Sequence, residues 1–340
     1  MTYAIPHMPS IDRLLRRAVD QRDRFGAPLP TRALSPLRTA AATVAVESRQ
    51  ERAALLTSRI AAGDGAARDD LAVLAEEALA EMRTSVRTAA MIKHPIQRLL
   101  AATDARWADC DTTELLDDPD LDPEVRTSIM TTLDHFNDVL GSYTRFFDML
   151  LPLARPTGTT RVLDLAAGHG GFPLAATREA RKRGLDFHFT ASDLKREYLD
   201  MGQEIADREN LPVDFIVQDA LDLSNIDPDS YDIIVCTQSL HHFPAGLITV
   251  MFDAATRAAT RGVVFADACR SALSGGLIAV TGTLRMRNAA FVHDGWVSMR
   301  RAFVPEELEL LARMARDDGE LESRWVPPAH CLLRWRPAQK

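Results

Sequence analysis

The sequence is poor in the features that mark several large classes of protein. Its four cysteines, Cys110, Cys236, Cys269 and Cys331, lie far apart and form no C-x-x-C pair. This spacing argues against structural zinc and a disulfide framework, and it predicts a cytoplasmic protein in a reducing compartment. No apolar run approaches the length of a membrane span, and the N-terminus lacks the apolar region of a secretory signal. We therefore expect no membrane partner.

Positive charge is also scarce. The 340 residues include 40 Lys and Arg against 48 Asp and Glu, which gives a formal net charge of −8. A nucleic-acid backbone normally requires a basic face, so we expect no nucleic-acid partner. With 46% apolar and 26% charged residues, the composition is that of a globular protein with one or two domains.

The most informative stretch is RVLDLAAGHGG, residues 161–171. Its apolar run predicts a strand buried on both faces of a parallel sheet, and a helical pattern opens at Phe172. A strand, a turn of small residues and a helix form a nucleotide-type loop, in which a ligand can approach the backbone. A dinucleotide fingerprint is incomplete, because Pro173 stands where the third glycine belongs.

This stretch resembles motif I of the class I S-adenosylmethionine-dependent methyltransferases, where small residues at alternate positions follow an acidic residue. The matching residues are Asp164, Ala166, Gly168 and Gly170, with alanine replacing the family's first glycine. The resemblance implies S-adenosylmethionine as the cofactor and a small-molecule methyltransferase with an N-terminal helical domain.

Beyond residue 160 the chain alternates strand and helix patterns. This alternation predicts an α/β fold with a doubly wound, mostly parallel Rossmann-like sheet. A hairpin is expected over 321–326 and 331–335, and the resemblance implies that its last strand is antiparallel to the sheet. Strands are expected at 161–165, 186–191, 213–218, 231–236 and 262–267, and helices near 171–183, 195–209, 245–259 and 304–317.

No strand pattern precedes residue 160. We therefore expect a helical cap or dimerisation domain at 1–150 and an S-adenosylmethionine-binding domain at 151–340, with a substrate-side insertion at 269–302. The N-terminal helices carry apolar stripes but few aromatic residues, which predicts that they pack against a second copy as a two-fold homodimer.

Polar residues follow the expected strands at the edge where open α/β sheets bind ligands. Asp193 can accept hydrogen bonds from both ribose hydroxyls of an adenosine, or it can cap the helix that starts near Lys195. The resemblance implies that Asp219 takes the adenine amino group; the alternative is a turn former beside Asp222. The remaining expected cofactor residues are Leu194, Ala220, Thr237 and Gln238.

Two histidines follow the fourth strand. The resemblance makes His241 the general base toward an acceptor hydroxyl, with His242 as its neighbour; alternatively, both only shape the loop. A hydroxyl needs a base, and a histidine with an unperturbed pKa near 6.5 suits that task. The alternative is a nitrogen or carbon acceptor, which can be methylated by positioning alone.

The expected insertion contains a further polar group. His293 is a third candidate for catalysis, while Asp294, Trp296, Arg300 and the earlier Tyr143 are candidates for substrate binding. A surface loop with incidental charges is the alternative. The histidines and Asp294 are residue types that bind metals, but their wide separation in sequence does not establish a single site. We therefore predict no metal.

Together these residues predict methyl transfer from S-adenosylmethionine to a small-molecule acceptor, a hydroxyl of a specialised metabolite. The nearest alternative is N- or C-methylation. A non-catalytic S-adenosylmethionine-binding protein is a second alternative. An NAD-dependent oxidoreductase is a third, weakened by Pro173 and by Asp219.

Overall fold

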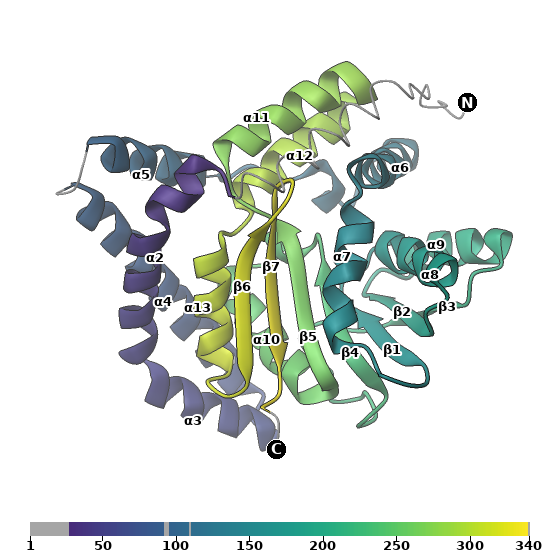
Figure 1. The fold of residues 1–340 in the computed structure, drawn as a ribbon, viewed down its shortest axis with the longest axis horizontal. Helices are drawn as coiled ribbons and strands as arrows, with labels where there is room; N and C mark the ends of the chain where they lie inside the picture. Colours follow the sequence, from purple (N-terminus) through teal and green to yellow (C-terminus); the bar gives the residue numbers. More distant parts are fainter. Residues whose placement is uncertain (1–26, 92–94, 109, 339–340) are drawn as a thin grey trace.

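The computed structural model describes residues 27–91, 95–108 and 110–338. A twisted sheet lies between layers of helices, and further helices gather beyond one end of the sheet (Figure 1). Within the expected helical domain at 1–150, residues 1–26, 92–94 and 109 lie outside the described part of the chain. Among the described helices, none is both long and apolar enough to cross a membrane.

The sheet has seven strands in the order β3-β2-β1-β4-β5-β7-β6. The first five are parallel, β7 pairs with β5 in the antiparallel direction, and β6 and β7 form a hairpin. The predicted fold class and the antiparallel terminal strand are therefore confirmed. The strands are β1 (Thr160–Asp164), β2 (Phe187–Asp193), β3 (Val213–Val217), β4 (Tyr231–Thr237), β5 (Ala259–Ala268), β6 (Glu320–Val326) and β7 (His330–Arg336).

Two apolar layers cover the sheet. On one face an aromatic cluster joins Phe146, Phe172 and Phe189 beneath α7 (Ser142–Leu150) and α8 (Gly171–Arg183). Next to α8, α9 (Arg196–Glu209) packs on β3 and β2. On the other face the main core lies under α10 (Ala245–Ala258) and α13 (Pro305–Ala315). The central strands read as continuous apolar runs because both of their faces are buried.

Three of the described N-terminal helices pack against the second layer: α2 (Leu29–Glu47), α3 (Gln50–Ala61) and α4 (Ala66–Met91). Helix α5 (Pro95–Ala108) packs on α4 and α2. Buried Leu71, Leu74 and Leu79 of α4 belong to the same core as α10 and α13. At Gly246 of α10 the two helices meet so closely that a Cβ would lie 2.1 Å from the Ala72 carbonyl oxygen. The apolar stripe of α4 is therefore covered within the chain.

The remaining helices build the wall of the site. The segment 123–150, before β1, forms two helices, α6 (Pro123–Leu140) and α7. They are separated by Gly141, which has a φ of +68°. The expected insertion forms α11 (Ala272–Thr281), a π-helical turn (Gly282–Met286) and α12 (Ala289–Arg301). Helix α12 contacts α6, and Figure 1 shows α6, α11 and α12 beyond the same end of the sheet.

The described residues also form three short 3-10 turns: η1 (Leu115–Asp117), η2 (Leu151–Leu153) and η3 (Leu240–His242). Turn η3 follows β4 and contacts both β5 and α12. The histidines at its end are thus placed between the sheet and the α6–α12 wall.

Candidate active site

The loop between β1 and α8 has the left-handed backbone that its small residues suggest. Ala166, Gly168 and Gly170 have φ values of +49°, +57° and +77°. At Gly170 a Cβ would also lie 2.9 Å from Phe215 Cε1. Glycine meets both demands without strain, whereas Ala166 adopts a conformation that L-residues disfavour.

Asp193 fastens this loop to the neighbouring strand. Its Oδ2 accepts a hydrogen bond from Gly168 N and its Oδ1 accepts one from Lys195 N, both at 2.9 Å. Asp193 therefore anchors the glycine-rich loop and also holds the backbone just before α9 begins. Leu194, next to it, is 66% exposed and offers an uncovered apolar surface beside the loop.

Asp219 lies at the end of the adjacent strand, since β2 and β3 pair up to Asp193 and Val217. It is exposed, and its Oδ1 accepts a hydrogen bond from Leu221 N at 2.8 Å, as a turn former does. Ala220 is buried beneath it. The structure thus brings the Asp193 and Asp219 strand ends to one edge of the sheet.

Asp164 and Thr237 lie deeper, at the ends of β1 and β4. Burial raises the pKa of Asp164 well above its ordinary range, while the neighbouring Thr237 acts in the opposite direction. Gln238 follows at a φ of +56° and pairs through its amide with Asn137 of α6, at 2.7 and 3.0 Å. Helix α6 is thereby tied to the end of β4.

A second contact from α6 was not anticipated from the sequence. Asp134 lies 2.6 Å from His169 Nε2 and accepts a hydrogen bond from Tyr143 at 2.7 Å. Burial lowers the pKa of His169, but Asp134 outweighs it and the net shift is upward. Tyr143, expected to touch substrate, therefore takes part in a clamp on the glycine-rich loop.

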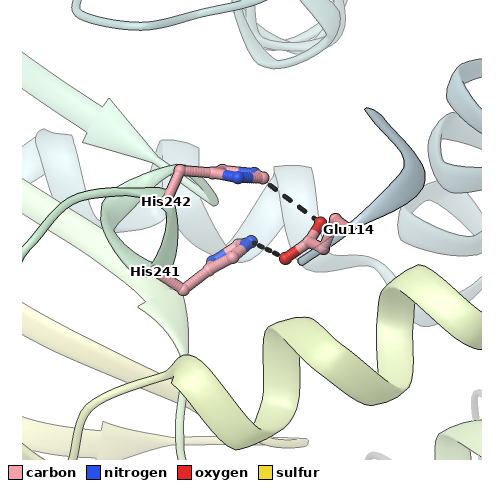
Figure 2. A group of neighbouring side chains, drawn as sticks. All are labelled: Glu114, His241 and His242. Atoms are coloured by element: carbon pink, nitrogen blue, oxygen red, sulfur yellow. Dashed lines mark ion pairs between the residues drawn. The ribbon is translucent and has the colours of Figure 1, made fainter. Parts of the chain in front are cut away.

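His241 is held between two buried carboxylates. Its Nδ1 lies 2.9 Å from both oxygens of Asp267, at the end of β5, and its backbone N–H donates to the same carboxylate. On the opposite side of the ring, Nε2 lies 3.5 Å from Oε1 of Glu114 (Figure 2). Asp267 was missed although it follows a strand as Asp193 does, and that signal could have found it.

His242 lies beside it, with the two ring centroids 4.3 Å apart. Its Nδ1 is 3.0 Å from Asp117 Oδ1, and its Nε2 is 3.8 Å from Glu114 Oε2. Figure 2 shows both rings directed toward the one carboxylate. Nothing in the sequence around Glu114, a run of acidic residues, distinguishes it as a site residue.

The assumption of a histidine with an ordinary pKa is wrong for His241. Burial lowers the pKa of His241, but the charges of Asp267 and Glu114 have the larger, opposite effect, and the net result is a pKa of about 9. The His241 ring therefore carries a proton on both nitrogens at neutral pH. In that state it cannot accept a further proton from an acceptor hydroxyl.

An apolar cavity of about 200 Å³ adjoins these side chains. Ile129, Leu133 and Phe136 of α6 line it together with Phe291 and Met299 of α12. The expected site residues that line the cavity are Gln238, His241, His242 and Asp294.

Asp294 supports the site through the backbone. It accepts hydrogen bonds from Leu115 N at 2.7 Å and from Leu116 N at 3.1 Å, and it lies 2.9 Å from His293 Nδ1. These bonds hold the turn that follows Glu114. The side chain expected to bind substrate thus positions another residue of the site.

The other three insertion residues expected in the site, His293, Trp296 and Arg300, lie outside the cavity lining. The Trp296 ring packs on Trp107 at 4.7 Å, and Arg300 donates to the Trp107 carbonyl, so both join α12 to α5. His293 is also absent from the lining, with a side chain that is 42% exposed. The sequence identified the segment but not which of its side chains face the cavity.

Comparison with known proteins finds one matching protein family. Residues 162–262 match the family described as a methyltransferase domain, a segment that runs from β1 into β5. No curated protein matches the chain. The fold is similar to magnesium protoporphyrin IX methyltransferase from Synechocystis PCC 6803 with bound SAH, at 14% identity over 70% of this chain and 94% of that one, with a TM-score of 0.41.

It is also similar to the plantazolicin methyltransferase BpumL, in complex with a pentazolic desmethylPZN analog and SAH. That similarity has 13% identity, covers 70% of this chain and 98% of the other, and has a TM-score of 0.46. At such identities and scores, the match of residues 162–262 is the more specific finding.

Proposed function

We propose that this chain, which contains a methyltransferase domain at residues 162–262, transfers a methyl group from S-adenosylmethionine to a small molecule in the α6–α12 cavity. One observation carries the proposal. Ser239 Oγ donates to the Ala166 carbonyl at 2.7 Å, while the preceding Gln238 lines the cavity. The cofactor loop and the cavity therefore meet at one point, where a methyl group can pass between them.

The cofactor lies, in this proposal, along the ends of β1 to β4. Asp193 accepts hydrogen bonds from the ribose hydroxyls, and Asp219 takes the adenine amino group, with Leu194 and Ala220 against the ring. The other cofactor contacts are Asp164, Ala166, Gly168, Gly170, Thr237 and Gln238, which surround the methionine portion.

The acceptor is an apolar small molecule with a hydroxyl group, in keeping with specialised metabolism. The facing aromatic and aliphatic side chains exclude water, so that the acceptor oxygen and the methyl group can be aligned. N- or C-methylation would use the same cavity by positioning alone.

His241 is proposed to relieve the hydroxyl of its proton. Because the His241 ring is protonated at neutral pH, this role requires that its Nε2 proton first be removed. If His241 acts alone, His241→Ala lowers kcat by about 10²–10⁴-fold with cofactor affinity intact, and His242→Ala lowers kcat only a few-fold.

The function is tested in two steps. Calorimetry should show binding of S-adenosylmethionine and S-adenosylhomocysteine but not of NAD; NAD binding alone would support the oxidoreductase. Labelled S-adenosylmethionine is then offered with hydroxyl, amine and activated-carbon acceptors. Cofactor binding without transfer to any acceptor class would support the non-catalytic alternative.

A two-fold homodimer and a cytoplasmic location complete the proposal. The dimer is supported by exposed apolar side chains on the N-terminal helices, since Leu55, Met91 and Leu99 are each more than 60% exposed. Light scattering at micromolar concentration should give twice the mass of one chain, and the mass of a single chain would contradict the dimer.

A further inference from the structure

The cavity wall carries a set of donors typical of a transition-metal site. One ligand atom each from Glu114, His241 and His242 lies within 4.8 Å of the other two. The closest approaches are 3.5 Å for His241 and 3.8 Å for His242, each to a Glu114 oxygen. Two donors on one tetrahedral zinc ion lie about 3.4 Å apart, so a small side-chain movement would bring the three onto one ion.

Each histidine is oriented as a metal ligand usually is. Asp267 lies at hydrogen-bond distance from Nδ1 of His241, and Asp117 does the same for His242. A carboxylate that accepts the Nδ1 proton fixes the ring and leaves the Nε2 lone pair for a metal. In both histidines it is Nε2 that faces Glu114.

Glu114 supplies an independent indication of a missing partner. The residue is only 4% exposed, and its Oε1 makes no hydrogen bond to any described residue. The nearby cation Arg301 pairs instead with Asp117. A buried carboxylate oxygen without a hydrogen bond is unfavourable unless a cation or another donor reaches it.

We propose that Glu114, His241 and His242 bind one divalent transition-metal ion of the zinc type, with the remaining coordination positions open to the cavity. This departs from the expectation of no metal. Two imidazoles and one carboxylate favour zinc and similar ions, whereas Mg²⁺ and Ca²⁺ prefer oxygen donors. Three protein ligands with an open position are typical of catalytic rather than structural zinc.

The role of the ion rests on the proposed methyl transfer. An acceptor hydroxyl bound to the ion would have a lowered pKa and would already have released its proton to the bulk solvent when it reacts. Its oxygen then forms the bond to the methyl carbon, the S–CH₃ bond breaks, and the electron pair stays on sulfur as neutral S-adenosylhomocysteine.

The test uses the full chain, stripped with a chelator and titrated with Zn²⁺, Co²⁺ and Mg²⁺. Elemental analysis should give one zinc per chain, Co²⁺ should develop visible absorption, and excess Mg²⁺ should displace neither. Glu114→Gln and His242→Ala should each weaken zinc affinity at least tenfold. His188→Ala is the matched control, because that ring also pairs with a carboxylate, Asp214, at 2.7 Å.

Circular dichroism establishes that each variant is folded. Wild-type chain without stoichiometric zinc, or folded Glu114→Gln with unchanged affinity, would overturn the site. Equal methyl transfer by metal-free and zinc-loaded chain would overturn the role of the ion, and the proposed methyl transfer would stand. Bound zinc in a chain that does not bind S-adenosylmethionine would overturn the proposed function and retain the site.

Discussion

Ala166 occupies a backbone conformation that the family's glycine would adopt more easily. Its φ of +49° lies in the left-handed region, where a Cβ costs about 1 kcal/mol. Gly168, two residues later, has a φ of +57° and open space around its missing Cβ. The two positions therefore isolate the effect of backbone strain from that of packing.

We expect Ala166→Gly to raise the free energy of unfolding by up to about 1 kcal/mol, because relief of strain exceeds the added chain entropy of glycine. Gly168→Ala should lower it by about 1–2 kcal/mol. Urea denaturation measures both changes. A shift in the same direction for the two variants would contradict this explanation.

Asp193 is the residue on which cofactor affinity should depend most. Asp193→Ala removes an acceptor for two ribose hydroxyls and should weaken S-adenosylmethionine binding by roughly 1.5–3 kcal/mol. Asp193→Asn keeps one oxygen that can accept the hydrogen bond from Gly168 N, so its loss of S-adenosylmethionine affinity should be smaller. Calorimetry on folded variants measures both, and unchanged affinity in Asp193→Ala would exclude the assigned cofactor site.

Helices α4 and α10 are in direct backbone contact, which links the N-terminal helices to the sheet. The Gly246 N–H donates to Glu76 Oε1 at 2.8 Å, and the absence of a Cβ allows Ala72 to approach. The contact depends on a single small residue at the start of α10.

Gly246→Ala should lower the free energy of unfolding by roughly 1–3 kcal/mol, because the new Cβ forces α4 away from α10. The matched control is Gly276→Ala in α11, where no atom lies within 4 Å of the added Cβ. That variant should stabilise the helix by about 0.5–1 kcal/mol. Thermal or urea denaturation distinguishes the two variants. An unchanged free energy of unfolding for Gly246→Ala would show that α4 and α10 can move apart without loss of stability.

At the scale of the whole molecule, folding buries His330 against Phe146, with ring centroids 4.9 Å apart. Burial lowers the pKa of His330 to about 4, although the Pro327 backbone and Asp267 oppose the shift. In the unfolded chain a histidine has a pKa near 6.5. Between these values only the unfolded chain binds the proton, so acid lowers the stability of the fold.

The free energy of unfolding should therefore fall by about 2 kcal/mol between pH 7 and pH 5 on account of this one group. His330→Gln keeps a polar side chain but cannot titrate, so its stability should depend less on pH by that amount. Urea denaturation at the two pH values measures the difference. An equal pH dependence in both proteins would contradict the role of His330.

The sequence by itself determined the α/β fold, the order of the strands and of four helices after residue 160, the glycine-rich loop and the carboxylates at the ends of β2 and β3, whereas α11 and α12 were expected only as an insertion. These features depend on neighbours in the chain, through apolar periodicity and backbone conformation, so they can be read locally. The boundaries were less certain: β5 begins at Ala259, before its predicted start, because it continues to pair with β4 near Tyr231.

Only the tertiary structure decided which charges surround His241 and His242. Glu114, Asp117 and Asp267 come from a turn before α6 and from the end of β5, and no sequence spacing relates them to the histidines. Coulombic and burial effects on a pKa depend on distance through the folded molecule, not along the chain. For the same reason Asp294 lies in the site and Trp296 lies outside it, because α12 directs residues two positions apart toward different neighbours.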